Sequence, residues 1–130
     1  MESAGSRVVA KRGKQTLGKW GEEQARVLLM EKGYLLVGEN IRPPYGEIDL
    51  VLRDGETLVF VEVKTRTTRT FGLPEEAITP AKIEHMAASA ESYIQELDAP
   101  DTPWRLDVVS VYVPGGAGNP EVVHIPNVQA

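Results

Sequence analysis

The chain has 130 residues, a formal net charge of -5 and no cysteine. This length suits one domain with one core, and the lack of cysteine excludes a disulfide framework and a thiolate zinc site. No stretch approaches the length of a transmembrane span and no apolar signal segment opens the sequence, so we expect a cytoplasmic protein with no membrane partner.

The charge is unevenly distributed along the chain. Residues 1–72 carry 12 Lys/Arg and 10 Asp/Glu, for +2, whereas residues 73–130 carry 2 and 9, for -7. A net negative charge at first sight disfavours a polyanionic partner, but metal binding to acidic residues of the first part would make it more positive. Net charge therefore does not decide whether the chain binds nucleic acid.

The N-terminal third begins with a basic segment and continues with a helix and a strand. Residues 1–14 contain four Lys/Arg among small residues and read as a flexible basic arm; a terminus without a role is the alternative. Residues 16–32 have helical periodicity, and Gly33 ends that helix. Its inward stripe is expected at Leu17, Gly21, Ala25, Leu28 and Leu29. A strand at 34–41 and a stiff turn at 42–46 follow.

The next segment predicts a β-hairpin with strands at about 47–53 and 57–65. Asp54-Gly55 is a pair favoured in a two-residue type I′ turn. That turn sets Asp49 opposite Phe60 and diagonal to Glu62, roughly 7–8 Å away at the backbone. Since strand side chains alternate, Asp49, Glu62 and Lys64 then share one face of the sheet. The residues expected on the other face are Ile48, Leu50, Val59, Val61 and Val63.

Two carboxylates and a lysine on one face suit a metal-dependent phosphodiester hydrolase. Mg²⁺ and Mn²⁺ prefer oxygen ligands, so Asp49 and Glu62 could hold one ion, with water and phosphate completing its coordination. Lys64 would point the same way and hold the attacking water or a phosphate oxygen. Alternating charges on an exposed strand are the structural alternative, but residues 58–61 are all apolar, which is unusual for an exposed strand.

The remainder of the chain predicts a loop, a helix and two strands. Residues 67–79 form a loop rich in hydroxyl and basic residues that could contact phosphate, or a plain solvated loop. Thr79-Pro80 opens a second helix, with a strand at 104–113 and a short edge strand at 122–125 after it. The buried stripe of that helix is expected at Ile83, Met86, Ala87, Ala90, Ile94 and Leu97. We expect one domain at 15–126 and a tail at 127–130.

Several segments of this order resemble the successive motifs of the YraN family. They are Gly18-Lys19-Trp20-Gly21-Glu22, Asn40-Ile41-Arg42, Gly46-Glu47-Ile48-Asp49-Leu50-Val51, Val59-Phe60-Val61-Glu62-Val63-Lys64-Thr65-Arg66, Phe71-Gly72 and Arg105-Leu106-Asp107-Val108-Val109. That bacterial family is placed in the PD-(D/E)XK nuclease superfamily, beside archaeal-type Holliday-junction resolvases. The resemblance, over about residues 15–125, implies an α/β restriction-endonuclease-like core with a mixed central sheet flanked by helices.

The resemblance also implies roles for individual residues. Asp49, Glu62 and the backbone carbonyl of Val63 would be metal ligands, and Lys64 the catalytic lysine. Glu22 matches a first-helix glutamate that can contribute to such sites; an exposed glutamate near a helix N-terminus is the alternative. Ile48 stands where the proline of the superfamily motif would be, a common departure.

Further side chains are weaker candidates for functional roles. Glu47 could join the acidic cluster or pair with Arg66, and Lys82 could touch a phosphate or be solvated. Arg42, Arg66 and Arg69 are further candidates for nucleic-acid contacts. Asp107, beside Arg105, is expected to be a structural partner. The aromatic residues Trp20, Tyr34 and Tyr45 could stack on bases, although core packing is the usual role.

The sequence therefore predicts a Mg²⁺- or Mn²⁺-dependent endonuclease acting on DNA. A branched or damaged substrate, as in repair or recombination, follows only by analogy with neighbouring families. The alternatives are a non-catalytic nucleic-acid- or protein-binding module that keeps the fold, and a purely structural acidic cluster paired with arginines. A homodimer would suit symmetric cutting of two strands.

Overall fold

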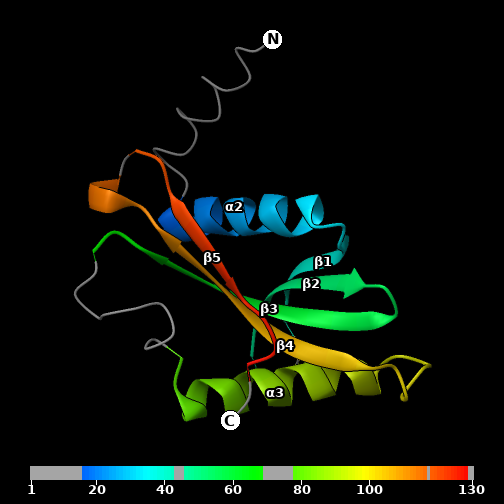
Figure 1. Ribbon diagram of the computed structural model, residues 1–130. Coiled ribbons are helices and arrows are strands. Elements are labelled where there is room, and N and C mark those ends of the chain that lie inside the picture. The colour runs from blue at the N-terminus through cyan, green and yellow to red at the C-terminus, as the bar shows by residue number, and fades with distance from the viewer. Residues whose placement is uncertain (1–15, 43–45, 69–77, 117, 129–130) are drawn as a thin grey trace.

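Five strands form one sheet, with a helix on each face (Figure 1). The computed structural model describes residues 16–42, 46–68, 78–116 and 118–128, so the basic arm at 1–14 lies outside the described residues. The main elements are α2 (Leu17–Glu31), β1 (Leu35–Ile41), β2 (Ile48–Asp54), β3 (Thr57–Arg66), α3 (Pro80–Gln95), β4 (Trp104–Tyr112) and β5 (Glu121–Ile125), with a short 3₁₀ turn at Pro114–Gly116. The predicted α/β class with a mixed sheet between helices is confirmed, and it is consistent with a restriction-endonuclease-like core.

The sheet is mixed because one of its neighbouring strand pairs is parallel. The strand order is β1-β2-β3-β4-β5, and the pairs β1-β2, β2-β3 and β4-β5 are antiparallel. β3 and β4 run parallel, which requires a crossover connection, and α3 lies within that crossover. α3 packs against the face of β3 on which Glu62 lies, because Phe60 shares an apolar cluster with Ile83 of α3 and Lys82 contacts Glu62.

Both helices begin as their sequences predict and α2 also ends as predicted, whereas α3 ends at Gln95, before Leu97 of its predicted stripe. Thr16 caps α2 by accepting a hydrogen bond from the Lys19 amide at 3.2 Å, and Gly33 follows the helix with a φ of +96°. Thr79 caps α3 in the same way, with Pro80 as its first residue. Trp20 is only 6% exposed, so it packs in the core and does not offer a ring for base stacking. Among the described residues, neither helix is long and apolar enough to cross a membrane.

The two faces of the sheet carry separate apolar clusters. Toward α2 lie residues of both hairpin strands, including Leu50 and Val61, as the predicted alternation requires. Toward α3 lie Val51, Phe60 and Ile83, among others. Ile48 was expected on the α2 side, but it packs in the α3-side cluster. It is the first residue of β2 and pairs with Ile41 of β1, which packs against the same cluster.

The predicted hairpin register is wrong by two residues. Asp54 pairs with Thr57, so the two-residue loop is Gly55-Glu56 and not Asp54-Gly55. Gly55 has a φ of +62°, whereas Glu56 has no positive φ, which excludes type I′ and fits a type II′ turn with glycine first. A shift of two keeps the paired side chains of the hairpin on their predicted faces, and Ile48, which lies before the first pair, is the exception. Leu50 pairs with Val61, so the next position in this register sets Asp49 beside Glu62, closer than the expected diagonal.

A buried carboxylate ties the C-terminal strands together. Asp107 of β4 is fully buried and accepts hydrogen bonds from Arg105 Nε at 3.1 Å and the Asn127 amide at 2.9 Å. It also lies 2.7 Å from His124 Nε2 of β5. The predicted structural pairing of Asp107 with Arg105 is confirmed. Val128, in the predicted tail, is only 8% exposed and packs on the α3 side.

Candidate active site

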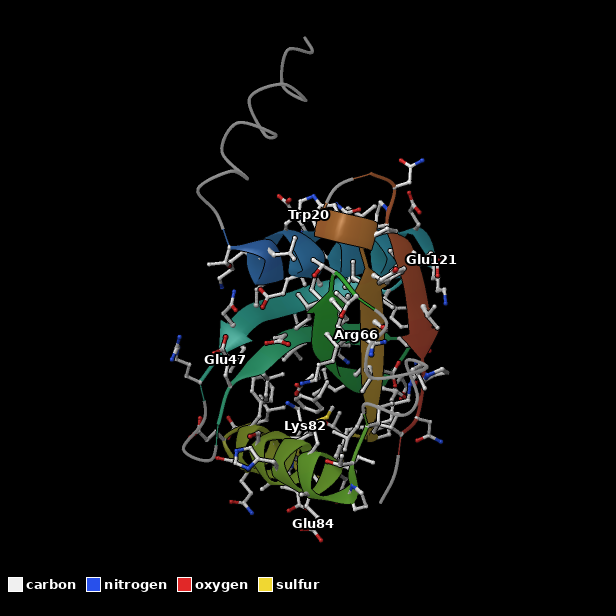
Figure 2. The ribbon with its side chains drawn as sticks, turned by 90° about the vertical axis from the view of Figure 1, so that its left-hand side faces the viewer. Trp20, Glu47, Arg66, Lys82, Glu84 and Glu121 are labelled. Carbon is white, nitrogen blue, oxygen red and sulfur yellow. The ribbon has the colours of Figure 1, made fainter. Side chains whose placement is uncertain are left out.

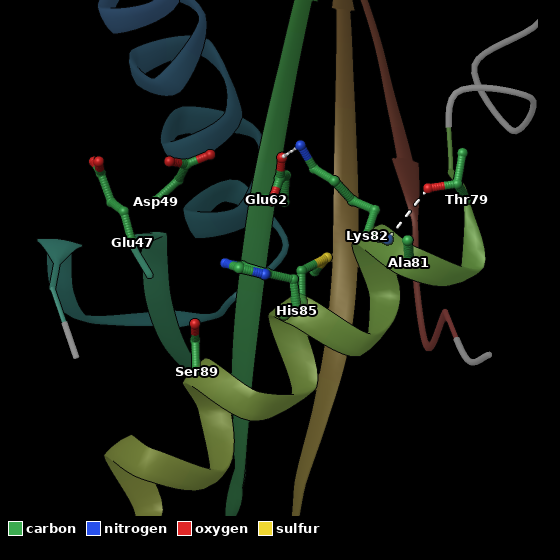
Figure 3. A pocket seen from close by; sticks show the side chains of 9 residues that line it. Glu47, Asp49, Glu62, Thr79, Ala81, Lys82, His85 and Ser89 are labelled. Carbon is green, nitrogen blue, oxygen red and sulfur yellow. Dashed lines mark hydrogen bonds and ion pairs between the residues drawn. The ribbon is translucent and has the colours of Figure 1, made fainter. Parts of the chain in front are cut away.

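A cleft of about 500 Å³ lies between the start of β2, the middle of β3 and the first half of α3 (Figure 3). Its sheet side presents three carboxylates, from Glu47, Asp49 and Glu62. The lining residues on the helix side are Thr79, Ala81, Lys82, His85, Met86 and Ser89. The predicted acidic cluster thus faces a cavity that is large enough for part of a substrate.

Asp49 is the most perturbed acidic group of the cleft. Its Oδ2 accepts a hydrogen bond from the Val63 amide at 2.8 Å, which fixes the carboxylate against β3. Burial raises the pKa of Asp49 to about 6, the Val63 hydrogen bond opposes this rise, and the negative charges of Glu22, Glu62 and Glu47 add to it. A cation in the cleft would relieve this repulsion.

Glu62 is held by two lysines. Its Oε2 lies 2.7 Å from Lys82 Nζ of α3 and 3.5 Å from Lys64 Nζ on the same strand. Hydrogen bonding to Glu62 raises the pKa of Lys82, whereas burial and then the neighbouring Lys82 lower the pKa of Lys64. The structure therefore brings together the predicted Asp49, Glu62 and Lys64, and it adds Lys82 as a direct partner of Glu62.

Glu22 and Glu47 extend the negative charge beyond Asp49. Burial raises the pKa of Glu22, the ion pair with Lys19 at 3.7 Å lowers it, and the charge of Glu47 raises it. Asn40 also hydrogen-bonds the Glu22 side chain. Glu22 is thus coupled electrostatically to the acidic cluster from α2. Asn40, which has a φ of +51°, is a supporting residue to which the sequence assigned no role.

The arginine candidates are placed differently. Arg42 is well exposed and lies 3.7 Å from Glu47, so the alternative in which Glu47 pairs with Arg66 is not what the structure shows. Arg66 is half-buried at the end of β3. Arg69 lies outside the described residues.

The carboxylates of the cleft fit a hard divalent cation only if water or backbone oxygens supply its remaining ligands. Within residues 16–42, 46–68, 78–116 and 118–128, no three Asp, Glu or His side chains are already arranged to hold a metal ion. Mg²⁺ commonly binds through one or two carboxylates and keeps several waters. Asp49 and Glu62 suit this mode, provided that Lys82 releases Glu62. The Val63 carbonyl as a further ligand stays a prediction.

Two residues of the cleft were missed by sequence reasoning. His85 and Ser89 lie one turn and two turns after Lys82, so helical spacing sets all three on one side of α3. This spacing was the available signal, but the partner strand could not be known in advance. Gly46 packs closely on both residues, since a Cβ there would lie 2.9 Å from His85 Nε2 and 3.2 Å from Ser89 Oγ.

The fold and the cleft define an α/β domain with a carboxylate-lined site beside its central sheet. Residues 21–111 match the family described as "Uncharacterised protein family UPF0102". This span is most of the chain, and the chain belongs to this family, the YraN family whose motifs its sequence resembles.

Individual relatives extend the similarity over most of their own length. A UPF0102 protein of Dehalococcoides mccartyi is 49% identical over 94 residues, which are 72% of this chain and 78% of the relative. A UPF0102 protein of Beutenbergia cavernae is 44% identical over 117 residues, covering 90% of this chain and 98% of the relative. One from Caldicellulosiruptor saccharolyticus is 44% identical over 100 residues, covering 77% and 85%. These names give the family and state no activity.

Proposed function

We propose that this chain is a metal-dependent nuclease that hydrolyses phosphodiester bonds in DNA. The observation that carries the proposal is the cleft in which Asp49 and Glu62, on adjacent strands, face the lysine-bearing side of α3. Half-buried carboxylates that repel one another are unfavourable unless cations accompany them, and the two lysines contact Glu62 while Asp49 accepts only the Val63 amide among the described contacts. Their presence in an open cleft suits metal binding better than it suits structural stability.

Four side chains and one backbone carbonyl have roles in this proposal. Asp49 and Glu62 would hold Mg²⁺ or Mn²⁺, with the Val63 carbonyl as a further ligand. When bound, the metal would stabilise negative charge on the phosphoryl group and lower the pKa of the attacking water. Lys64, on the same face, would orient that water or a phosphate oxygen. Lys82 would neutralise Glu62 before metal binding and contact substrate phosphate afterwards.

A non-catalytic nucleic-acid- or protein-binding module is the second candidate, and one contact favours it. Glu62 is already paired with both Lys82 and Lys64, and such a satisfied cluster does not require a metal. A module of this kind would keep the fold and would bind its partner without cutting it. The acidic composition of residues 73–130 also suits a partner other than DNA.

The test is cleavage of labelled linear, single-stranded, flapped and four-way DNA with Mg²⁺, Mn²⁺ or EDTA. Wild type should cut at least one substrate only with metal, and Asp49→Asn and Glu62→Gln should lose this cutting. Asp98→Asn is the matched control, because Asp98 is exposed and lies outside the cleft. Binding without cutting would favour the module. The comparison of branched with linear DNA tests the repair or recombination substrate, which rests on analogy alone.

A further inference from the structure

Arg66 is a partly buried cation in which two nitrogen atoms make no hydrogen bond. It is the last residue of β3 and is half-buried. Its Nε and Nη1 atoms are buried and have no hydrogen-bond partner. A buried donor without a partner destabilises the folded state, and a charged donor does so more than a neutral one. A guanidinium in this state is poised to accept an anion.

No neighbouring acid supplies that anion among the described residues. Glu47, the expected partner of Arg66, pairs with Arg42 instead, and Glu62 is taken by Lys82 and Lys64. Arg66 lies beside Tyr112 in the parallel pairing of β3 with β4, yet neither Nε nor Nη1 donates to it. Within the described part of the chain, Nε and Nη1 of Arg66 therefore have no partner, and a bound anion would supply one.

The position of Arg66 relates it to the cleft. Strand side chains alternate, so Glu62, Lys64 and Arg66 lie on the same face of β3, the face toward α3. At about 3.3 Å per residue, Arg66 lies roughly 13 Å along the strand from Glu62. Figure 2 shows Arg66 on β3 above Lys82 of α3. The basic side chains of Lys82, Lys64 and Arg66 thus form a row that begins at the carboxylates and reaches the end of β3.

We propose that Arg66 forms a phosphate-binding subsite next to the cleft. Guanidinium groups bind phosphate oxygens through several charge-assisted hydrogen bonds, and a partly buried guanidinium does so with less competition from water. We take the phosphate bound by Arg66 to be a DNA backbone phosphate next to the one that is cut, and this assignment rests on the proposed function. A free phosphate or small phosphate ester would share the same chemistry.

The first experiment measures phosphate binding in EDTA, where neither metal nor cleavage takes part. Melting temperature is followed while inorganic phosphate is titrated at constant ionic strength with chloride. The variants are Arg66→Met, which keeps the apolar stem, and Arg66→Lys, which keeps the charge. Arg53→Met is the matched control, because Arg53 is an exposed arginine at the hairpin end of β2. All are compared with wild type, because phosphate also stabilises proteins non-specifically.

Phosphate should raise the melting temperature of wild type and Arg53→Met more than that of Arg66→Met. Arg66→Lys should keep part of the response. A purely structural Arg66 predicts a different result, namely a less stable Arg66→Met protein whose response to phosphate equals that of wild type. That result would overturn the subsite. If Arg66→Met does not fold, a wild-type response to phosphate in Arg66→Lys overturns it as well.

The second experiment identifies the source of the phosphate. Binding of labelled single- and double-stranded DNA is measured in EDTA at several salt concentrations. A backbone phosphate predicts weaker binding by Arg66→Met and a salt dependence whose slope falls by about 1. A response to inorganic phosphate without any effect on DNA binding supports the subsite and assigns it to a small phosphate. Absence of metal-dependent cutting would refute the nuclease and leave both results interpretable.

Discussion

Replacing Asp49 by asparagine should stabilise the metal-free protein while removing its response to metal. The introduced amide would keep an oxygen that can accept the hydrogen bond from the Val63 backbone. It would lack the negative charge that burial and three neighbouring carboxylates disfavour. Functional carboxylates often oppose stability in this way, because their environment is arranged for a ligand.

The size of this effect follows from the pKa of Asp49. The ordinary pKa is 3.8 and the folded value is about 6, a difference that corresponds to roughly 3 kcal/mol at 1.36 kcal/mol per pKa unit. Because the pKa of Asp49 is raised in the folded protein, protonated Asp49 favours folding. This contribution to stability is complete below pH 3.8 and is lost as pH rises through about 6. The free energy of unfolding of the variant should therefore exceed that of wild type by up to roughly 3 kcal/mol at about pH 8. At about pH 5 the difference should be roughly half of that.

The assay is urea unfolding in EDTA at both pH values, followed by melting with and without Mn²⁺. Wild type should be stabilised by Mn²⁺ and the variant should not. Asp98→Asn, at an exposed position, controls for the loss of one negative charge. An Asp49→Asn protein that is less stable than wild type at about pH 8, or a stability difference that does not change with pH, would refute the reasoning.

Three further predictions concern Lys82, Asp107 and Gly46. Lys82→Met should raise Mn²⁺ affinity about 2- to 5-fold, since Lys82 competes for Glu62. The same variant should cleave DNA more slowly, because it lacks the proposed phosphate contact. Unchanged Mn²⁺ affinity in calorimetry would contradict the prediction. Asp107→Asn should cost about 3 kcal/mol at neutral pH. Burial raises the pKa of Asp107, but its hydrogen bonds outweigh this and lower the pKa below the ordinary value of 3.8. The stability that ionised Asp107 contributes is therefore lost as pH falls below 3.8. Unfolding measured near neutral pH and in acid should show that the stability difference between wild type and Asp107→Asn shrinks in acid. Gly46→Ala should cost about 1–3 kcal/mol, because Gly46 has a φ of +144° and contacts His85; a melting temperature equal to that of wild type would rule this out.

Local patterns in the sequence were sufficient for most elements of the fold. Thr16 and Thr79 cap helices because a side-chain oxygen can satisfy a free amide within the first turn, and this needs no distant residue. Apart from that of Ile48, the faces of the hairpin residues were predictable for the same reason, since alternation depends only on the chain. Even the wrong turn left them unchanged, because the register error was an even number of residues.

The partners within the site could not be read from local patterns. Lys82 reaches Glu62 only because α3 crosses over the sheet to connect two parallel strands, a contact between residues 20 apart in the sequence. The same crossing places His85 and Ser89 in the cleft, although neither residue has a local motif that links it to the carboxylates. Asp107 and His124 meet through pairing of β4 with β5.

Local sequence patterns specify the helices, the strands, the faces of most hairpin residues and the residue types that suit a hard metal ion. Packing of distant segments sets the register that brings Asp49 beside Glu62, the ion pairs of Glu62, and the burial that shifts the pKa of Asp49. The division has a physical reason. Propensity, capping and alternation act between residues a few positions apart, whereas desolvation and charge coupling depend on which distant segments pack together.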